Sequence, residues 1–253
     1  MTLIATAISR HGLVHAAVAG LTSYPKHQTT GRRVFRLEFL NAALTVTGGY
    51  VMDGGEPLDE WIKAAIESYK HTAEPHTVGG FAEYLTERLT PQPNPVHRRM
   101  VHIAGYAEDG NRPHPVHYFV RNVLRSKPDG TYGRAGRAFV VSEEYWSRDH
   151  RNPDIRNAIA AGGAHVYLNG FPDRRISYLA LHQRMHDLYQ RMWSGSRRFH
   201  PPHSLEDLVA FLALDLRATV AFLGTGRRDG EAVDDMKLEV ESIPAPARAV
   251  AFS

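Results

Sequence analysis

The chemistry of this protein must come from oxygen, nitrogen or imidazole groups, because its 253 residues include no cysteine. A thiolate nucleophile, a thiolate zinc site and a disulfide framework are therefore excluded. Histidine is frequent, with 15 copies, and several of these side chains could titrate near neutral pH. We expect the charge and the solubility of the protein to change between about pH 5 and about pH 7.

Three pairs of histidines have the spacing of metal ligands. His182 and His186 lie four residues apart on a predicted helix, as two zinc ligands do in metallopeptidases. Gln183 stands where such an enzyme needs a glutamate, and the sequence offers no identifiable third ligand. The other two pairs, each interrupted by proline, are His114 with His117 and His200 with His203. Because prolines fit loops equally well, we predict no metal site.

Ser23 and Lys26 match the Ser-x-x-Lys pattern of acyl-serine enzymes, in which one helical turn places the lysine beside the serine. Pro25 disfavours a helical conformation at Tyr24, and the companion motifs of those enzymes are missing. The sequence also lacks a Gly-x-Ser-x-Gly elbow, a phosphate-binding loop and a Gly-x-Gly-x-x-Gly fingerprint. We therefore expect no acyl-serine mechanism and no cofactor.

The charge balance predicts no strong attraction to nucleic acid. Lys and Arg number 30 against 27 Asp and Glu, which gives a net charge of +3. The densest basic runs, at Arg98-Arg99 and Arg197-Arg198, are short and lack interleaved aromatic side chains on which bases could stack. We expect these runs to be solvated surface.

The apolar stretches of the chain do not fit a membrane span or a secretion signal. The longest of them is interrupted by Asp215 and Arg217. Near the N-terminus, the segment 10–12 (Arg-His-Gly) cuts the apolar run, and no basic segment precedes that run. We expect a soluble, cytoplasmic protein that binds neither nucleic acid nor membrane.

Strands and helices are predicted in separate blocks along the chain. The predicted strands are residues 2–9 and 13–17, which form an opening hairpin around the turn at 10–12, and residues 34–37, 43–47, 100–106, 117–123, 138–141, 164–168, 236–240 and 247–252. The predicted helices are residues 57–69, 77–89, 176–192 and 204–224, with Thr77 as the N-cap of the second. The pattern leaves a short helix over 152–163 open. Such blocks favour an α+β protein of antiparallel sheets covered by paired helices. No repeat or low-complexity linker divides the chain, so residues 1–253 are predicted to form one domain.

A series of short motifs is spaced along roughly the first 50 residues. These motifs are a threonine directly after Met1, the segment 12–17 (Gly-Leu-Val-His-Ala-Ala), Thr22, the segment 31–37 (Gly-Arg-Arg-Val-Phe-Arg-Leu) and the segment 45–48 (Thr-Val-Thr-Gly). Together they resemble the start of proteasome β subunits, a family of N-terminal nucleophile hydrolases. Beyond them only the order of the elements agrees. The resemblance implies a four-layer αββα sandwich, in which helix pairs flank two antiparallel sheets.

The resemblance also implies a threonine nucleophile at the N-terminus. If Met1 is removed, Thr2 carries a hydroxyl and a free α-amino group, whose pKa of about 7.7 to 8.0 suits it to act as the base for its own side chain. Gly48 stands where the family has its oxyanion donor, and Thr22 where it has a contact to the substrate strand. The implied substrate is a peptide or another amide.

Two positions depart from the pattern of that family. Where the family has a lysine on the third strand, this chain has Arg33, and where it has a carboxylate that holds the lysine, this chain has Val18. Arginine supplies positive charge but gives up no proton at working pH, and valine cannot bind it. We therefore predict an atypical hydrolase site with Thr2, Arg33 and Gly48 as catalytic residues.

The same departures support an alternative hypothesis, a catalytically inactive ring-forming or scaffold protein of the same fold. In either case the resemblance implies lateral packing into rings, so we expect a homo-oligomer of about six or more chains. Loss of Met1 separates the two hypotheses, because the hydrolase requires it and the scaffold does not.

Overall fold

A computed structural model describes eleven stretches of the chain in detail. They are residues 3–19, 31–49, 51–52, 55–90, 99–109, 112–123, 135–143, 159, 164–170, 202–225 and 237–247. Within these stretches the protein is α+β, with two antiparallel sheets and three α-helices.

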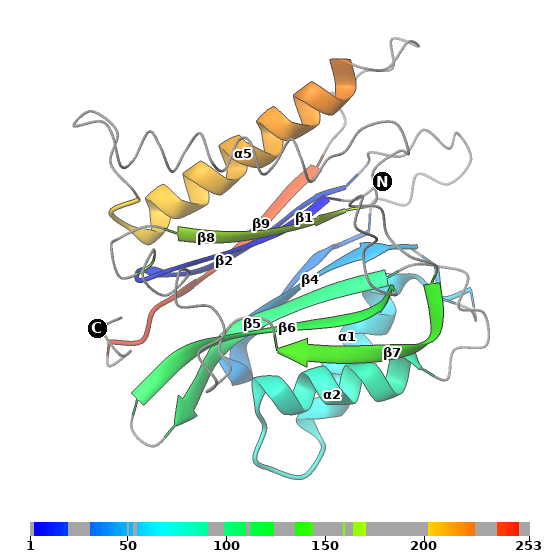
Figure 1. Cartoon of the computed structure of the whole chain (residues 1–253). Coiled ribbons are helices and arrows are strands. Elements are labelled where there is room, and N and C mark those ends of the chain that lie inside the picture. The colour runs from blue at the N-terminus through cyan, green and yellow to red at the C-terminus, as the bar shows by residue number, and fades with distance from the viewer. Residues whose placement is uncertain are drawn as a thin grey trace.

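The smaller sheet has four strands in the order β8-β1-β2-β9 (Figure 1). Their bounds are β1 Leu3–Ser9, β2 Gly12–Ala19, β8 Ala164–Gly170 and β9 Lys237–Pro244. The predicted opening hairpin is confirmed, since β1 pairs with β2 and Ser9 lies opposite Gly12. The hairpin turn requires glycine, because φ at Gly12 is +151° and a Cβ there would collide with the carbonyl oxygen of Ile243 on β9.

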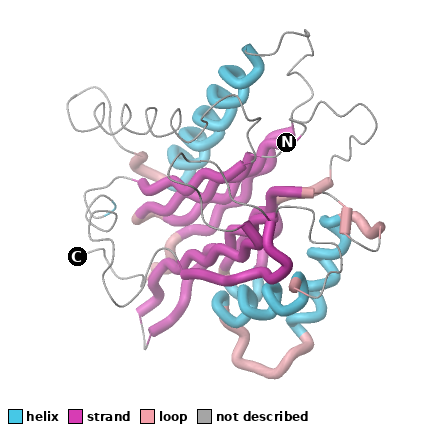
Figure 2. The backbone as a smooth tube through the Cα atoms, turned by 45° about the vertical axis from the view of Figure 1, so that its right-hand side comes forward, coloured by secondary structure: helices cyan, strands magenta, loops and turns pink. Residues whose placement is uncertain are grey.

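The larger sheet has five strands in the order β3-β4-β5-β6-β7. Their bounds are β3 Val34–Leu37, β4 Ala42–Gly48, β5 Arg99–Asp109, β6 Arg112–Val123 and β7 Ala135–Glu143. A short 3-10 helix, η1 Glu38–Leu40, joins β3 to β4. The two sheets lie face to face, and Figure 2 shows their strands as two magenta layers.

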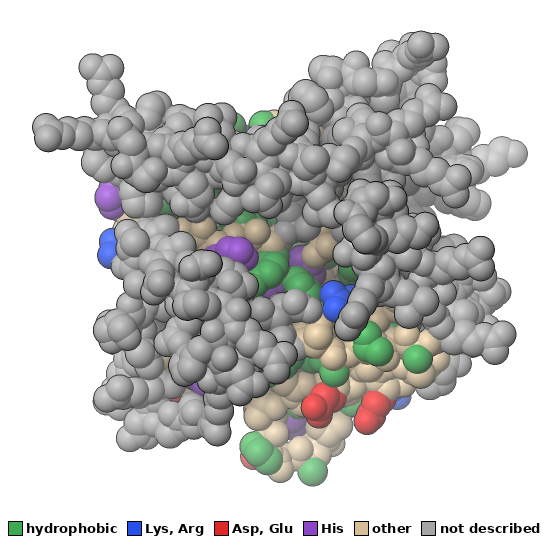
Figure 3. All heavy atoms as spheres, in the orientation of Figure 1, with side chains coloured by type: hydrophobic (Ala, Val, Ile, Leu, Met, Phe, Trp, Pro, Cys, Tyr) green, Lys and Arg blue, Asp and Glu red, His purple; other side chains and the backbone are tan. Residues whose placement is uncertain are grey.

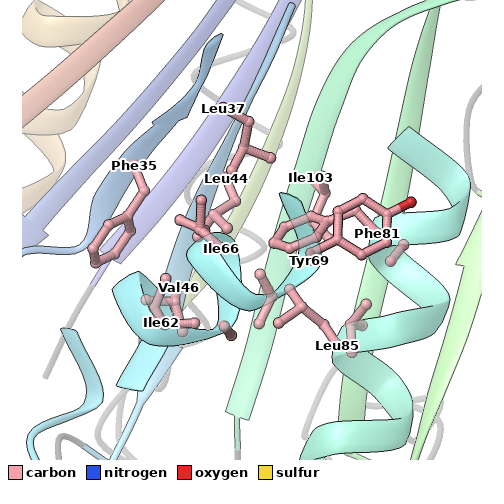
Figure 4. Close-up of a cluster of buried hydrophobic side chains, with 14 of the residues drawn as sticks. Phe35, Leu37, Leu44, Val46, Ile62, Ile66, Tyr69, Phe81, Leu85 and Ile103 are labelled. Atoms are coloured by element: carbon pink, nitrogen blue, oxygen red, sulfur yellow. The ribbon is translucent and has the colours of Figure 1, made fainter. Parts of the chain in front are cut away.

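Two helices lie between β4 and β5 in the sequence and cover the outer face of the larger sheet. These are α1 Leu58–Lys70 and α2 Val78–Leu89. The predicted cap of α2 is confirmed, because the Thr77 hydroxyl accepts a hydrogen bond from the Gly80 N–H at 2.9 Å. Both helices present apolar faces to the sheet, where Ile62, Ile66 and Phe81 form one buried cluster with Leu44 and Ile103 of the strands (Figure 4).

A third helix, α5 Leu205–Thr225, covers the outer face of the smaller sheet (Figure 1). Its Leu208 and Leu212 pack against Leu3 and Ala5 of β1. Because side chains alternate along a strand, the intervening residues of β1 point the other way, toward the larger sheet. Every residue of β1 is buried for this reason.

The predicted element order is confirmed wherever the structure describes it. Strands β5, β6 and β9 are longer than predicted, because polar residues continue the pairing beyond the apolar runs that were used to find them. The predicted helix 176–192 lies outside the described residues, as do all but one residue of segment 152–163 and of strand 247–252. Among the described helices none is long and apolar enough to cross a membrane.

Candidate functional site

Two of the four predicted site residues are described, and the structure brings them together. Arg33 Nη1 donates to the carbonyl oxygen of Gly48 at 3.4 Å, a long hydrogen bond between the residue before β3 and the end of β4. The Arg33 side chain is buried, and Gly48 has φ of +114°, a conformation that favours glycine. Thr2 and Thr22 lie outside the described residues.

The backbone around Arg33 is fixed by a carboxylate from the smaller sheet. Glu239 Oε2 on β9 accepts from the Arg33 N–H at 2.7 Å and from the Val34 N–H at 3.1 Å. The Arg33 carbonyl accepts from the Val46 N–H of β4 at 3.0 Å. The backbone of Arg33 is therefore hydrogen-bonded to both sheets, independently of its side chain.

Val18 does not face Arg33, so the expected pairing of these two positions is wrong. Val18 pairs with Leu3 across the hairpin, and both side chains lie on the face of the smaller sheet that α5 covers. Strand alternation sends the preceding residue, Ala17, toward the larger sheet instead. The side chains that meet between the sheets at this level form an apolar cluster of Ile4, Ala17 and Val34.

A second buried arginine holds the segment that follows β4. Arg99 pairs with Gly48 across the β4–β5 ladder. Its Nη2 donates to the Val51 carbonyl at 2.7 Å and its Nε to the Gly49 carbonyl at 3.5 Å. Carbonyl groups of the segment therefore accept hydrogen bonds from two guanidinium groups, which restrains the backbone at Gly48.

A set of polar side chains is buried between the two sheets, and we call it the imidazole cluster. Its members are Thr6, His15, His102, His117 and Asn169. The three imidazoles are fully buried, and the ring nitrogens of two of them contact Thr6. In Figure 3, histidine side chains are also visible among hydrophobic ones at the level where the sheets meet.

The contacts in this cluster form a chain whose donors and acceptors are consistent in either of two directions. Asn169 Nδ2 lies 2.6 Å from His102 Nε2, and the Thr6 hydroxyl lies 3.1 Å from His102 Nδ1 and 3.2 Å from His15 Nδ1. If Asn169 donates to His102 Nε2, then His102 Nδ1–H donates to the Thr6 oxygen and the Thr6 hydroxyl donates to His15 Nδ1. Reversing the Asn169 amide reverses every donor and acceptor, and both rings stay neutral in either direction.

His117 lies at the centre of an aromatic group and has no hydrogen-bond partner within the described part of the chain. Its ring meets those of Phe119 and Tyr167 edge-on, each at a centroid distance of 4.6 Å, and that of His102 at 5.1 Å. A buried N–H and a buried ring nitrogen without partners each cost stability.

Burial keeps all three histidines of the cluster neutral. Desolvation lowers the pKa of His15 from its ordinary value of 6.5 to about 4, against an opposing interaction with the Ala104 backbone. Desolvation also lowers the pKa of His102 and of His117 well below the ordinary value, and the neighbouring imidazoles add to the effect. The cluster is therefore an uncharged layer at neutral pH, and its full burial keeps these rings away from any substrate.

The structure places one of the histidine pairs with ligand-like spacing, His114 and His117, on a strand. These residues lie on β6, three positions apart, so their side chains point to opposite faces of the sheet. No group of three or more potential ligands occurs among the described residues. His182, His186 and His200 lie outside those residues, and His203 is exposed.

A surface pocket of about 300 Å³ opens between β3 and α1, on the far side of the larger sheet from the imidazole cluster. Its lining mixes both signs of charge with aromatic rings. Lys63 Nζ lies 2.7 Å from Glu60, and Lys70 Nζ lies 2.6 Å from Glu67. These two ion pairs are exposed, so each contributes little stability. The lining has four basic side chains against two acidic ones, with Phe35 and Phe39 beside them.

Comparison of the sequence with protein-family models and with curated proteins gives no match.

Proposed function

We propose that the protein is an N-terminal-threonine hydrolase of amide or peptide bonds, similar to proteasome β subunits, with an atypical active site. The observation that carries this proposal is the contact between Arg33 and Gly48, two residues that the resemblance assigns to one site. They lie 15 positions apart, Arg33 directly before β3 and Gly48 at the end of β4, so their contact depends on the pairing of these two strands.

The order of the elements gives further support. A hairpin opens the chain, a helix pair is inserted between β4 and β5, and α5 precedes β9. Helices cover the outer faces of both sheets. We propose that the predicted helix over 176–192 pairs with α5, which would complete the four-layer αββα sandwich of N-terminal nucleophile hydrolases.

In the proposed mechanism, Thr2 acts after Met1 has been removed. Its α-amino group takes the proton of its hydroxyl, and the oxygen attacks the carbonyl carbon of the substrate. The Gly48 N–H stabilises the negative oxygen of the tetrahedral intermediate, and the charge of Arg33 favours the neutral form of the amine. The leaving amine takes the proton, and water then hydrolyses the ester to Thr2. Thr22 would contact the substrate strand.

A second candidate is the inactive ring-forming or scaffold protein of the same fold. The apolar cluster of Ile4, Ala17 and Val34 favours it, because these side chains occupy the space between the sheets at the start of β1. Neither candidate needs a cofactor, and the proposed assembly for both is a homo-oligomeric ring.

The deciding experiment combines intact-mass measurement with labelling. We expect the purified protein to lack Met1, to cleave peptide amides, and to form one covalent adduct with a threonine-directed electrophile. Thr2→Ala should abolish cleavage and labelling, while Thr2→Ser, the matched control, should retain both in part because it keeps a hydroxyl. A protein without Met1 that neither cleaves nor labels would favour the scaffold.

A further inference from the structure

We propose that Glu239 is a positioning residue for Arg33, so that the carboxylate serving the candidate site comes from β9 and not from the end of β2. This role depends on the proposed function, because it takes Arg33 to be part of the active site. Glu239 lies more than 200 positions from Arg33 in the sequence.

The Glu239 carboxylate binds two consecutive backbone N–H groups. One oxygen, Oε2, accepts the consecutive N–H groups of Arg33 and Val34 at 2.7 and 3.1 Å. Hydrogen bonds to an ionised acceptor are about twice as strong as neutral ones. The Glu239 side chain is 11% exposed, so water competes little for this oxygen. Lys237 Nζ lies 3.4 Å from the other oxygen, Oε1, and the Lys237 side chain is mostly exposed.

Glu239 and Arg33 also lie at strands that end the described order of their sheets. β3 is an edge of the larger sheet, and β9 ends the described order of the smaller one. An edge strand leaves N–H groups without a neighbouring strand. Glu239 takes up two such groups at the point where the chain enters β3, and so joins the two sheets beside Arg33.

A chain of contacts continues from Glu239 through Arg33 to β4. The Arg33 carbonyl is bonded to Val46, and the Arg33 guanidinium reaches the Gly48 carbonyl. A shift of the Arg33 backbone would therefore move its charge relative to Gly48. A displacement of about 1 Å at a catalytic group can cost about a hundredfold in rate.

β9 also supplies a matched control. Glu241 lies two residues after Glu239 on the same face of the strand and reaches across to β3 in the same way. Its Oε1 accepts from the Arg36 side chain at 3.0 Å, whereas Glu239 binds backbone. Removing either charge changes the net charge equally, but only Glu239 fixes the backbone of Arg33.

The experiment compares Glu239→Ala, Glu239→Gln and Glu241→Gln in the full chain. Amide hydrogen exchange at Arg33 and Val34, measured by NMR without substrate, should accelerate at least about tenfold in Glu239→Ala. It should accelerate less in Glu239→Gln, which keeps a neutral acceptor, and not at all in Glu241→Gln. For cleavage of a peptide amide, kcat should fall about tenfold in Glu239→Gln, and KM should change little.

Unchanged exchange at Arg33 and Val34 in the Glu239 variants would overturn the proposal, whatever the activity. Faster exchange with wild-type kcat would overturn the positioning role as well. If Glu239→Ala fails to fold, Glu239→Gln decides alone. If the wild-type protein cleaves no amide, the proposed function fails by itself, and the exchange data still decide whether Glu239 fixes Arg33.

Discussion

The Thr6 hydroxyl and His102 Nδ1 lie 3.1 Å apart although β1 and β5 belong to different sheets. This contact and the one between Asn169 and His102 join the sheets through polar groups that are fully or partly buried, and His15 contacts Thr6 from the neighbouring strand of the same sheet. Because the imidazoles can remain there only in the neutral form, the stacking of the two sheets should depend on pH.

We predict that the free energy of unfolding falls steeply as the pH is lowered from about 6.5 to about 4. The pKa of His15 drops from 6.5 when unfolded to about 4 when folded, so in this window the unfolded chain binds more protons. Protonation linked to His15 alone should lower the free energy of unfolding by about 3 kcal/mol at pH 4. His102 and His117 act with the same sign.

One buried carboxyl opposes this trend. Burial raises the pKa of Asp215 from 3.8 to about 6, so between these values the folded state binds more protons and gains stability as the pH falls. Three histidines should outweigh it. Urea unfolding followed at pH 7.5, 6 and 5 would measure the slope, and constant stability over this range would contradict the prediction.

Replacing His117 by Phe should leave stability at pH 7 unchanged or raise it by about 1 kcal/mol. The substitution removes two ring nitrogens that have no hydrogen-bond partner and keeps an aromatic ring among Phe119 and Tyr167. It should also flatten the dependence on pH.

His102→Phe is the matched comparison and should destabilise the protein by about 2 kcal/mol at pH 7. It leaves Thr6 and Asn169 without their ring-nitrogen partners in a buried site. Both variants are compared by urea unfolding. Equal losses in the two would show that ring packing, and not hydrogen bonding, decides the role of each histidine.

Arg33→Met should raise the apparent pKa of the rate profile if the proposed function is correct. The guanidinium disfavours the ammonium form of the α-amino group of Thr2, so its loss should shift the activity toward higher pH and lower the rate. Arg36→Met, which removes a guanidinium paired with Glu241, is the control and should not shift the profile. The dependence of kcat/KM on pH measures both, and an unshifted Arg33→Met profile would separate Arg33 from the nucleophile.

Local patterns predicted the elements because each element carries its own signal. Thr77 marks the start of α2, and the turn segment 10–12 between two apolar runs marks the hairpin of β1 and β2, which is confirmed. The strand ends were less predictable, since residues such as Glu239 extend β9 through pairing with β2 and not through their own hydrophobicity.

The contacts of the candidate site were mostly beyond local patterns. Glu239 meets Arg33 across 206 positions, and Thr6 meets His102 across 96. The Thr6 and His15 pair could have been found from the sequence, because polar residues at inward positions of an otherwise apolar hairpin indicate a buried polar contact. Placing Val18 at the carboxylate position opposite Arg33 was wrong for a local reason. A shift of one position along a strand moves the side chain to the other face of the sheet.

That shift of one position leads to the last prediction. Val18→Asp would bury a carboxylate among Leu3 and the leucines of α5, so it should destabilise the protein by about 3 kcal/mol or more. The double variant Val18→Asp, Arg33→Lys should hydrolyse peptides no faster than the single variant Arg33→Lys. Ala17→Asp with Val34→Lys would instead place the two charges between the sheets, where Ala17 and Val34 belong to one apolar cluster.

The double variant Ala17→Asp, Val34→Lys should unfold at a higher urea concentration than either single variant, because each single change buries an unpaired charge. If Thr2 is the nucleophile, the double variant should also cleave peptides faster than either single variant. Additive losses of stability would show that positions 17 and 34 do not pair, and the assignment of Ala17 to the inward face beside β3 would then be wrong.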